Sequence, residues 1–230
     1  PARKGSKRIL NKNIKKFNGK PIISYSIKAA LKSNLFDEII VSTDSSKIAK
    51  ISKYYGATVP FKRPKRLSNN STTTHSVIKH AIKKMILNKK HPKYICCLYP
   101  TSPLITEDDL KESFKLLKKY KPEFVFAASK CDANTTRSFT IKKNKKIERF
   151  IFKKNNMVNS QKLLELYCDA GQFYWGTISS WLNNDYCIVK NSLVFDLPKW
   201  KSIDINEIED FKFAEIVYKG MKLYESKYND

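Results

Sequence analysis

The chain has 230 residues, of which 45 are lysine or arginine and 21 are aspartate or glutamate, giving a formal net charge of +24. This length suits one domain with a full hydrophobic core, and the charge invites a nucleic-acid partner. However, only six of the basic residues are arginine, the residue that most often contacts nucleic-acid bases. The lysines are spread over the whole chain. We therefore expect a solvated surface and no nucleic-acid partner.

The first thirteen residues form a basic segment around a single glycine. Five of them are lysine or arginine, and Gly5 and Ser6 lie in their middle. Glycine lets backbone N–H groups approach a ligand, serine supplies a hydroxyl donor, and the surrounding positive charges suit a polyphosphate. The segment lacks the glycines of a P-loop or a dinucleotide-binding turn. On its own it is equally consistent with a disordered, lysine-rich segment.

The next elements follow the pattern of a parallel α/β domain. Residues 21–31 have the spacing of an amphipathic helix, residues 38–42 are apolar like a buried strand, and another helical run follows. Residues 57–61 are predicted to be extended. In such domains ligands gather at the carboxyl ends of the strands.

The polar run 68–74 predicts a loop that ends in a helix cap. Thr74 at its end either contacts a ligand or only caps the helix that follows. Residues 94–98 then predict a buried strand, and Thr106 begins a capping-box pattern for a helix to about Tyr120.

The second half of the chain alternates strand and helix patterns. Residues 130–168 differ in character, because their two short strands predict a hairpin that cannot bury both faces alone. A final amphipathic helix follows the loop 202–206. The predicted strands are residues 124–129, 138–141, 147–152, 171–175, 187–190 and 193–197.

The five cysteines show neither a C-x-x-C pair nor zinc-ligand spacing. Two of them, Cys96 and Cys97, lie in an apolar strand, where free cysteine behaves as a small hydrophobe. We therefore expect reduced cysteines. Because no run of residues resembles a signal peptide or a membrane span, we also expect a cytoplasmic protein without a membrane partner.

Four blocks of sequence together resemble the CMP-sialic acid synthetases. They are Pro-Ala-Arg-x-Gly-Ser-Lys-Arg-Ile with Lys12-Asn13, Ile-Val-Ser-Thr-Asp at 40–44, Tyr-Pro-Thr-Ser-Pro at 99–103, and Asp-Ala-Gly-Gln-Phe-Tyr-Trp-Gly at 169–176. The last block is most similar to the pseudaminic acid cytidylyltransferase branch. The resemblance extends over nearly the whole chain.

This resemblance implies a three-layer α/β/α, Rossmann-like nucleotide-diphospho-sugar transferase fold with a mainly parallel mixed sheet. Residues 1–230 would form a single cytidylyltransferase domain, and residues 130–168 an arm that crosses to a second subunit of a homodimer. The alternative for the arm is an ordinary surface hairpin. In the family an apolar strand leads into the first block. That strand is missing from this sequence, so we expect these residues alone to fold poorly.

The implied reaction transfers CMP from CTP to the anomeric hydroxyl of a nine-carbon 2-keto acid sugar, pseudaminic acid first of all, and releases pyrophosphate. The product is a nucleotide sugar for cell-surface glycans such as those of flagellin or lipopolysaccharide. Arg3, Lys12 and Asp204 are the implied catalytic residues. The implied CTP-binding residues are Arg3, Ser6, Lys7, Lys12, Asn13, Arg63, Thr72 and Thr74.

The sugar and metal sites follow from the same resemblance. Asp204 would bind Mg²⁺, with Asn206 a doubtful second ligand because the family has aspartate there; alternatively, Asp204 caps the last helix. Asn159 and Cys168 also depart from the family pattern, at positions where it has arginine and tends to have histidine. The implied sugar-binding residues are Tyr99, Arg137, Gln161, Asp169 and Gln172, with a purely packing role as the alternative for Tyr99.

Three other functions stay open at this point. The same reaction on N-acetylneuraminic or legionaminic acid is the nearest alternative. A catalytically impaired nucleotide-binding homologue is the second, because of Asn159, Asn206 and the missing strand. A basic nucleic-acid binder is the remote third.

Overall fold

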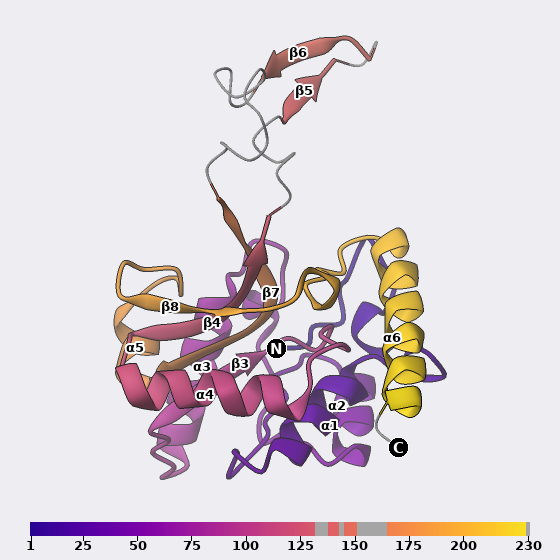
Figure 1. The fold of residues 1–230 in the computed structure, drawn as a ribbon. Helices are drawn as coiled ribbons and strands as arrows, with labels where there is room; N and C mark the ends of the chain where they lie inside the picture. Colours follow the sequence, from indigo (N-terminus) through magenta and orange to yellow (C-terminus); the bar gives the residue numbers. More distant parts are fainter. Residues whose placement is uncertain (132–137, 143–144, 151–164, 229–230) are drawn as a thin grey trace.

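The computed structural model describes residues 1–131, 138–142, 145–150 and 165–228. Its centre is a mixed sheet of four strands in the order β3-β7-β4-β8 (Figure 1). Strand β7 is antiparallel to both neighbours and β4 is parallel to β8, so β3, β4 and β8 all run in one direction. The predicted α/β fold with a mixed sheet is confirmed. The strands are β3 (Tyr94–Leu98), β4 (Phe124–Lys130), β7 (Tyr167–Thr177) and β8 (Ser192–Asp196).

Helices cover both faces of this sheet. Helices α1 (Ile23–Ser33) and α4 (Glu107–Tyr120) pack on one face, where Trp175 of β7 is buried. Helices α3 (Thr74–Leu87) and α5 (Ile178–Asn183) pack on the opposite face, where the preceding strand residue Tyr174 is buried. Successive residues of a strand face opposite sides, so β7 contributes to both cores and the fold has three layers.

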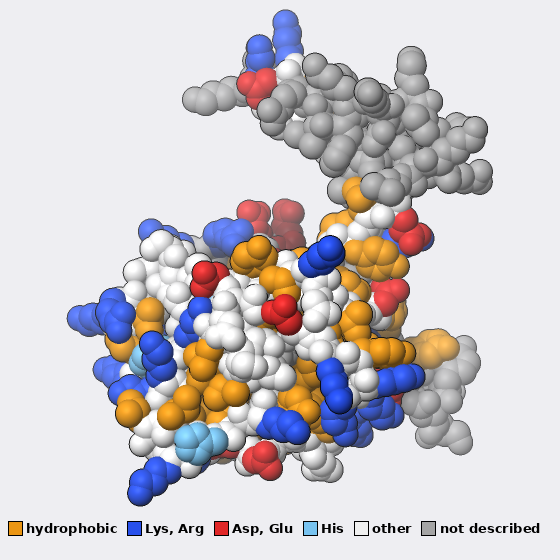
Figure 2. Space-filling view, turned by 90° about the vertical axis from the view of Figure 1, so that its left-hand side faces the viewer, with side chains coloured by type: hydrophobic (Ala, Val, Ile, Leu, Met, Phe, Trp, Pro, Cys, Tyr) orange, Lys and Arg blue, Asp and Glu red, His pale blue; other side chains and the backbone are white. Residues whose placement is uncertain are grey.

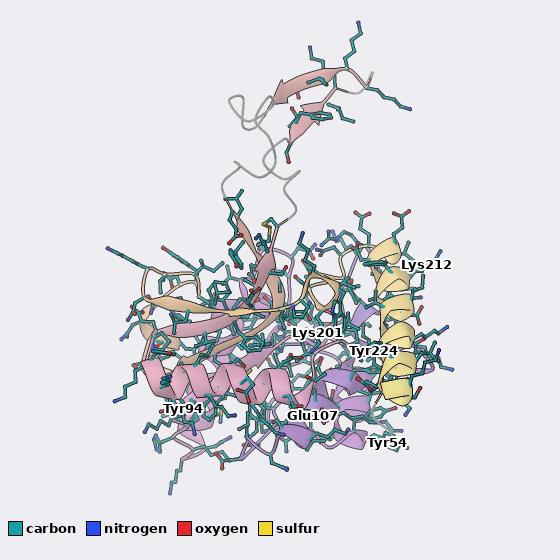
Figure 3. All side chains as sticks on the ribbon, in the orientation of Figure 1. Tyr54, Tyr94, Glu107, Lys201, Lys212 and Tyr224 are labelled. Atoms are coloured by element: carbon teal, nitrogen blue, oxygen red, sulfur yellow. A yellow bond between two sulfur atoms is a disulfide. The ribbon has the colours of Figure 1, made fainter. Side chains whose placement is uncertain are left out.

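Helix α4 begins as its sequence predicts. The side chains of Thr106 and Asp109 form a reciprocal capping box. Lys201 also donates to Asp109, at 2.7 Å, and both side chains are nearly buried. Figure 3 shows Lys201 near the start of α4, where Glu107 lies, whereas Lys212 and Tyr224 lie along α6. This ion pair connects α4 to the segment that carries residues 203–206.

The remaining elements are short, apart from α2 and the C-terminal α6. The predicted hairpin is confirmed as the antiparallel pair β5–β6. No helix in the described part of the chain is both long enough and apolar enough to cross a membrane. The bounds are α2 (Ser46–Tyr54), α6 (Ile208–Tyr228), β1 (Lys16–Phe17), β2 (Lys20–Pro21), β5 (Phe139–Ile141), β6 (Ile147–Phe150), and the 3₁₀ turns η1 (Lys12–Ile14), η2 (Lys65–Leu67) and η6 (Lys199–Lys201).

The strand predicted at 187–190 is wrong. That segment forms a turn that the Ser192 side chain closes, accepting from the Val189 N–H at 3.2 Å and donating to the Cys187 carbonyl at 2.7 Å. A local side-chain hydrogen bond of this kind competes with strand pairing.

The strand predicted at 38–42 forms only isolated parallel bridges, such as Ile40 to Thr58. The backbone of this segment is hydrogen-bonded along one edge, where the Val41 N–H donates to the Thr58 carbonyl at 2.9 Å. Its other side borders an apolar cavity of about 840 Å³ that residues 95–98 of β3 also line. Within the described residues, no backbone hydrogen bond connects β3 to residues 39–41 across this cavity. Pro1 also lines the cavity.

Cys131 and Cys168 form a disulfide, with their Cα atoms 5.6 Å apart. The expectation of reduced cysteines is therefore wrong for this pair, while Cys96, Cys97 and Cys187 are free. The antiparallel pairing of Lys130 with Tyr167 brings Cys131 and Cys168, the residues that follow these two, close together on a diagonal. Their separation of 37 residues in the sequence gave no local sign of this proximity.

Candidate active site

A polar pocket of about 530 Å³ lies beside the basic N-terminal segment. It collects side chains from that segment, from the loop before α3, from the loop after β3 and from the segment before α6. Tyr99 and Asn206 are among them. All eight residues predicted to bind CTP line this pocket: Arg3, Ser6, Lys7, Lys12, Asn13, Arg63, Thr72 and Thr74.

The basic segment is held in place by the chain around it. The Ala2 N–H donates to the Ser42 carbonyl and the Lys4 N–H to the Asp44 carboxylate, both at 2.9 Å. Asn13, which is buried, donates from its side chain to the Arg3 carbonyl at 2.9 Å. These contacts overturn the alternative of a disordered terminus. They also give Asn13 a role in shaping the loop, besides its predicted place beside the nucleotide.

Lys12 connects two sides of the pocket. Its Nζ donates to the Ile205 carbonyl at 2.5 Å, which links the basic segment to the segment 203–206. Burial lowers the pKa of Lys12 below that of an ordinary lysine, and the nearby Arg8 and Arg3 lower it further, whereas Asp204 opposes the shift. A partly desolvated ammonium group is a stronger partner for phosphate than a solvated one.

Arg63 is an unusual feature of the pocket wall. Its side chain is 4% exposed, and its Nε and Nη2 atoms have no hydrogen-bond partner in the described structure. Burial lowers its pKa, while Asp44 acts in the opposite direction. Because an unpaired buried donor costs about 1–3 kcal/mol, these N–H groups are suited to a ligand that brings acceptor atoms.

Thr74 does not cap helix α3. The cap is Thr73, whose hydroxyl accepts from the Ser76 N–H at 3.2 Å, so the capping alternative for Thr74 is wrong. The Thr74 hydroxyl instead lies 2.9 Å from that of Tyr99. The Thr72 hydroxyl donates to the Asn69 side chain at 2.7 Å, a hydrogen bond within the loop that precedes α3.

The predicted sugar-binding residues are not all brought to the pocket. Tyr99 lines the pocket. Asp169 is not among the lining residues, and its carboxylate accepts from the Tyr174 hydroxyl at 2.7 Å. Gln172 is 1% exposed and donates to the carbonyls of Ala170 and Ile203, so the structure places it in the core. Arg137, Gln161 and the departure at Asn159 lie outside the described residues.

The predicted metal ligands are neighbours at the edge of the pocket. The exposed Asp204 accepts from the side-chain NH₂ group of Asn206 at 2.6 Å, and the side-chain oxygen Oδ1 of Asn206 accepts from Arg8 at 2.6 Å. The capping alternative for Asp204 is also wrong, because α6 starts at Ile208 and Asp210 accepts from the N–H groups of Asn206 and Glu207.

One carboxylate beside substrate phosphates is a donor set that Mg²⁺ uses, so Asp204 fits such an ion. The Asn206 side-chain oxygen already accepts from Arg8, so a metal ion bound there would have to share this oxygen with a positively charged guanidinium group. The described residues contain no group of three acidic, histidine or cysteine side chains that could hold a metal by themselves.

Sequence reasoning did not single out three residues of this site. Arg8 lies in the basic segment but was given no role, although it lines the pocket. Asn70 accepts from Arg3 at 2.6 Å, and Asn69 accepts from the N–H groups of residues 71 and 72. The run of Asn and Ser at 68–71 was a sign of such side-chain-closed turns.

A three-layer α/β/α fold with a basic loop and a polar pocket beside its mixed sheet is typical of nucleotide-binding α/β proteins. The family described as Cytidylyltransferase matches residues 1–223. The chain therefore belongs to the cytidylyltransferase family.

Individual relatives agree with this assignment. A pseudaminic acid cytidylyltransferase from Campylobacter jejuni is 40% identical over 219 residues, which cover 95% of this chain and 94% of that protein. A CMP-N,N'-diacetyllegionaminic acid synthase from Legionella pneumophila is 30% identical, covering 91% of this chain and 86% of that protein. The solved structure of a CMP:2-keto-3-deoxy-manno-octonic acid synthetase complexed with CTP has the same fold, with a TM-score of 0.69 over 96% of this chain and 97% of that one, at 14% identity.

Proposed function

We propose that this protein transfers CMP from CTP to the anomeric hydroxyl of pseudaminic acid and releases pyrophosphate. The observation that carries this proposal is the pocket itself, which gathers all eight residues expected to bind CTP from two separate regions of the chain. The 40% identical relative named for this reaction supports the sugar, since the legionaminic relative is 30% identical.

The pocket supplies what phosphoryl transfer needs. The sugar hydroxyl attacks the α-phosphorus in line, and the protein contributes mainly by positioning and charge. Arg3, Lys7 and Lys12 bring positive charge to the pocket, where the triphosphate would bind and pyrophosphate would leave. Arg63 and Thr74 lie in the same pocket and would face the base.

A bound Mg²⁺ would neutralise phosphate charge in this reaction. Asp204 would hold it, and the Asn206 side chain keeps the Asp204 carboxylate in place by donating to it. Asn206 in turn is fixed by Arg8. We therefore expect a single protein carboxylate at the metal.

Asp204→Ala is expected to shift the magnesium dependence of turnover to concentrations at least about tenfold higher, since removing the one carboxylate weakens ion binding. Circular dichroism should be unchanged, because Asp204 is exposed and caps no helix. A magnesium titration of pyrophosphate release measures the effect. Asp185→Ala, which removes an exposed carboxylate paired with Lys79, is the matched control. An unchanged titration for Asp204→Ala would remove this residue from the metal site.

The sugar is tested by pyrophosphate release with CTP and each of three acids: pseudaminic, N,N'-diacetyllegionaminic and N-acetylneuraminic. We expect the highest kcat/KM with pseudaminic acid. A higher value with either of the others would move the protein to that sibling activity. Release with none of them, despite CTP binding, would favour a catalytically impaired homologue.

We further propose that the protein acts as a cytoplasmic homodimer without a nucleic-acid partner. In the β5–β6 hairpin, Ile141 and Ile147 are more than half exposed, an apolar surface that a second subunit would cover. Light scattering should give twice the chain mass of 26.7 kDa, and the monomer mass would contradict the dimer. Figure 2 shows lysine and arginine side chains in several separate places on one face, the arrangement of a solvated surface.

A further inference from the structure

The segment that carries Asp204 pairs with no strand in the part of the chain that the structure describes. Ile203 and Ile205 are buried in one core cluster, whereas Asp204 between them is exposed. In place of a neighbouring strand, two side chains donate to the backbone carbonyls of this segment. Lys12 donates to the Ile205 carbonyl at 2.5 Å. Gln172 of β7 donates to the Ile203 carbonyl at 3.0 Å, so different elements hold the peptide groups on either side of Asp204.

Gln172 belongs to a bulge in β7. The pairing of β4 with β7 shifts here, because a step of two residues on β4 matches a step of five on β7, from Tyr174 to Asp169. Such a bulge changes the direction in which side chains point and is common beside active sites. The Gln172 amide donates to the Ala170 carbonyl within the bulge and to the Ile203 carbonyl outside it, both at 3.0 Å. It therefore ties the segment before α6 to the bulge.

The Asp204 side chain packs on the same bulge. Gly171 has a φ of +60°, in the left-handed region that favours glycine. A Cβ at this position would lie 3.4 Å from the Asp204 Cγ and 3.5 Å from its Oδ1. The carboxylate is thus next to the bare backbone of β7. The bulge meets both the side chain of Asp204 and, through Gln172, the peptide group before it.

Packing alone does not account for an amide at position 172. Gln172 is 1% exposed, and its Oε1 has no hydrogen-bond partner within the described structure. A buried acceptor left unpaired is destabilising, and an apolar side chain of the same length would not bring one. What the amide contributes is its pair of donated hydrogen bonds, which fix the Ile203 carbonyl relative to β7.

We propose that the β7 bulge, through Gln172 and Gly171, holds Asp204 in the position in which it binds Mg²⁺ beside the CTP phosphates. Gln172 is a positioning residue in this arrangement. It does not line the pocket and acts through Asp204. This inference rests on the proposed nucleotide and metal site, and it gives Gln172 a role in metal binding in place of the predicted contact with the sugar.

The test measures CTP binding by calorimetry with Mg²⁺ and with EDTA, in the absence of any sugar. The dissociation constant in EDTA divided by that in Mg²⁺ is the gain in affinity that the ion brings. Gln172→Met removes both donated hydrogen bonds at a similar side-chain length. We expect the gain to fall about tenfold, the lower end of the range for residues that orient a metal ligand. The dissociation constant in EDTA should stay within about twofold, because Gln172 does not line the pocket.

Trp175→Phe is the matched control. Trp175 is another buried residue of β7, and its Nε1 donates to the Ser113 hydroxyl at 3.0 Å. Neither of these residues lines the pocket. The variant should lower the thermal unfolding midpoint, because it loses a buried hydrogen bond, and should leave the gain unchanged. A fall in the gain as large as that of Gln172→Met would indicate a general loosening of the fold and would overturn the inference.

Gly171→Ala tests the same bulge from its backbone, and it keeps the test decisive if Gln172→Met does not fold. Alanine is disfavoured at this φ, and its methyl group would meet the Asp204 carboxylate, so the gain should fall here too. In an Asp204→Ala background, neither substitution should change the gain further. An unchanged gain in either folded single variant, or a further fall in that background, would overturn the inference.

The two proposals fail in different ways. An unaltered protein that gains CTP affinity from Mg²⁺ but releases no pyrophosphate with any of the sugars contradicts the transfer reaction and leaves the role of the bulge to the binding measurements. A gain that is insensitive to Gln172→Met overturns the inference and leaves the transfer reaction intact. An unaltered protein whose CTP affinity does not respond to Mg²⁺ would also overturn the inference, and pyrophosphate release alone would then decide the transfer reaction.

Discussion

Lys12→Ala is expected to lower the turnover of pyrophosphate release by about 10²–10³-fold, the scale for losing one preorganised donor to a developing negative charge. Lys12 is suited to this role because it is partly buried, lines the nucleotide pocket and is fixed by its hydrogen bond to the Ile205 carbonyl. Loss of the side chain removes the charge and also the link between the basic segment and residues 203–206.

Lys4→Ala is the matched control for this experiment. Lys4 belongs to the same basic segment, but its side chain is exposed and lies outside the residues that line the pocket. Its turnover should stay within about twofold of the unaltered protein, because an exposed charge is screened by solvent and salt. Equal losses in the two variants would mean that net charge, and not the position of Lys12, determines the rate.

An apolar strand joined ahead of Pro1 is expected to raise the thermal unfolding midpoint by about 10 °C. The cavity of about 840 Å³ lies between β3 and residues 39–41, and no backbone bond crosses it within the described residues. Five extended residues span roughly 17 Å, about the length of the five-residue β3.

The size of this effect follows from opposing contributions. Each buried aliphatic side chain contributes about 1.5–3 kcal/mol and each backbone hydrogen bond about 1 kcal/mol, against an ordering cost of about 1–2 kcal/mol per residue. A net gain of about 3 kcal/mol corresponds to roughly 10 °C for a chain of this length.

Differential scanning calorimetry measures the midpoint, and an extension of five serine and glycine residues is the control. That control brings backbone atoms but no apolar side chains to the cavity. Equal midpoints for the two extensions would show that the cavity does not accept a strand.

The helices of this protein could be predicted from local sequence, since their signals lie within a few residues of one another. The capping box at Thr106 and the apolar spacing of residues 21–31 both gave helices at the expected places. Strands depend on distant partners, and here prediction was less reliable. Residues 38–42 have the composition of a buried strand but lack a partner on one side, and residues 187–190 turn because of Ser192.

The site was predicted to the extent that its residues belong to contiguous blocks. The basic segment and the loop before α3 were both recognised, and the structure brings them to one pocket. What could not be predicted depends on tertiary contacts. Burial of Gln172, the pairing of Arg8 with Asn206 and the contact of Thr74 with Tyr99 all join positions far apart in the chain.

The bond between Cys131 and Cys168 closes a covalent ring in the chain. A protease that cuts at one point inside this ring would leave two pieces still attached to each other through sulfur. Such a nicked protein would migrate near its full mass on a denaturing gel without a thiol and separate into two bands when a thiol is added.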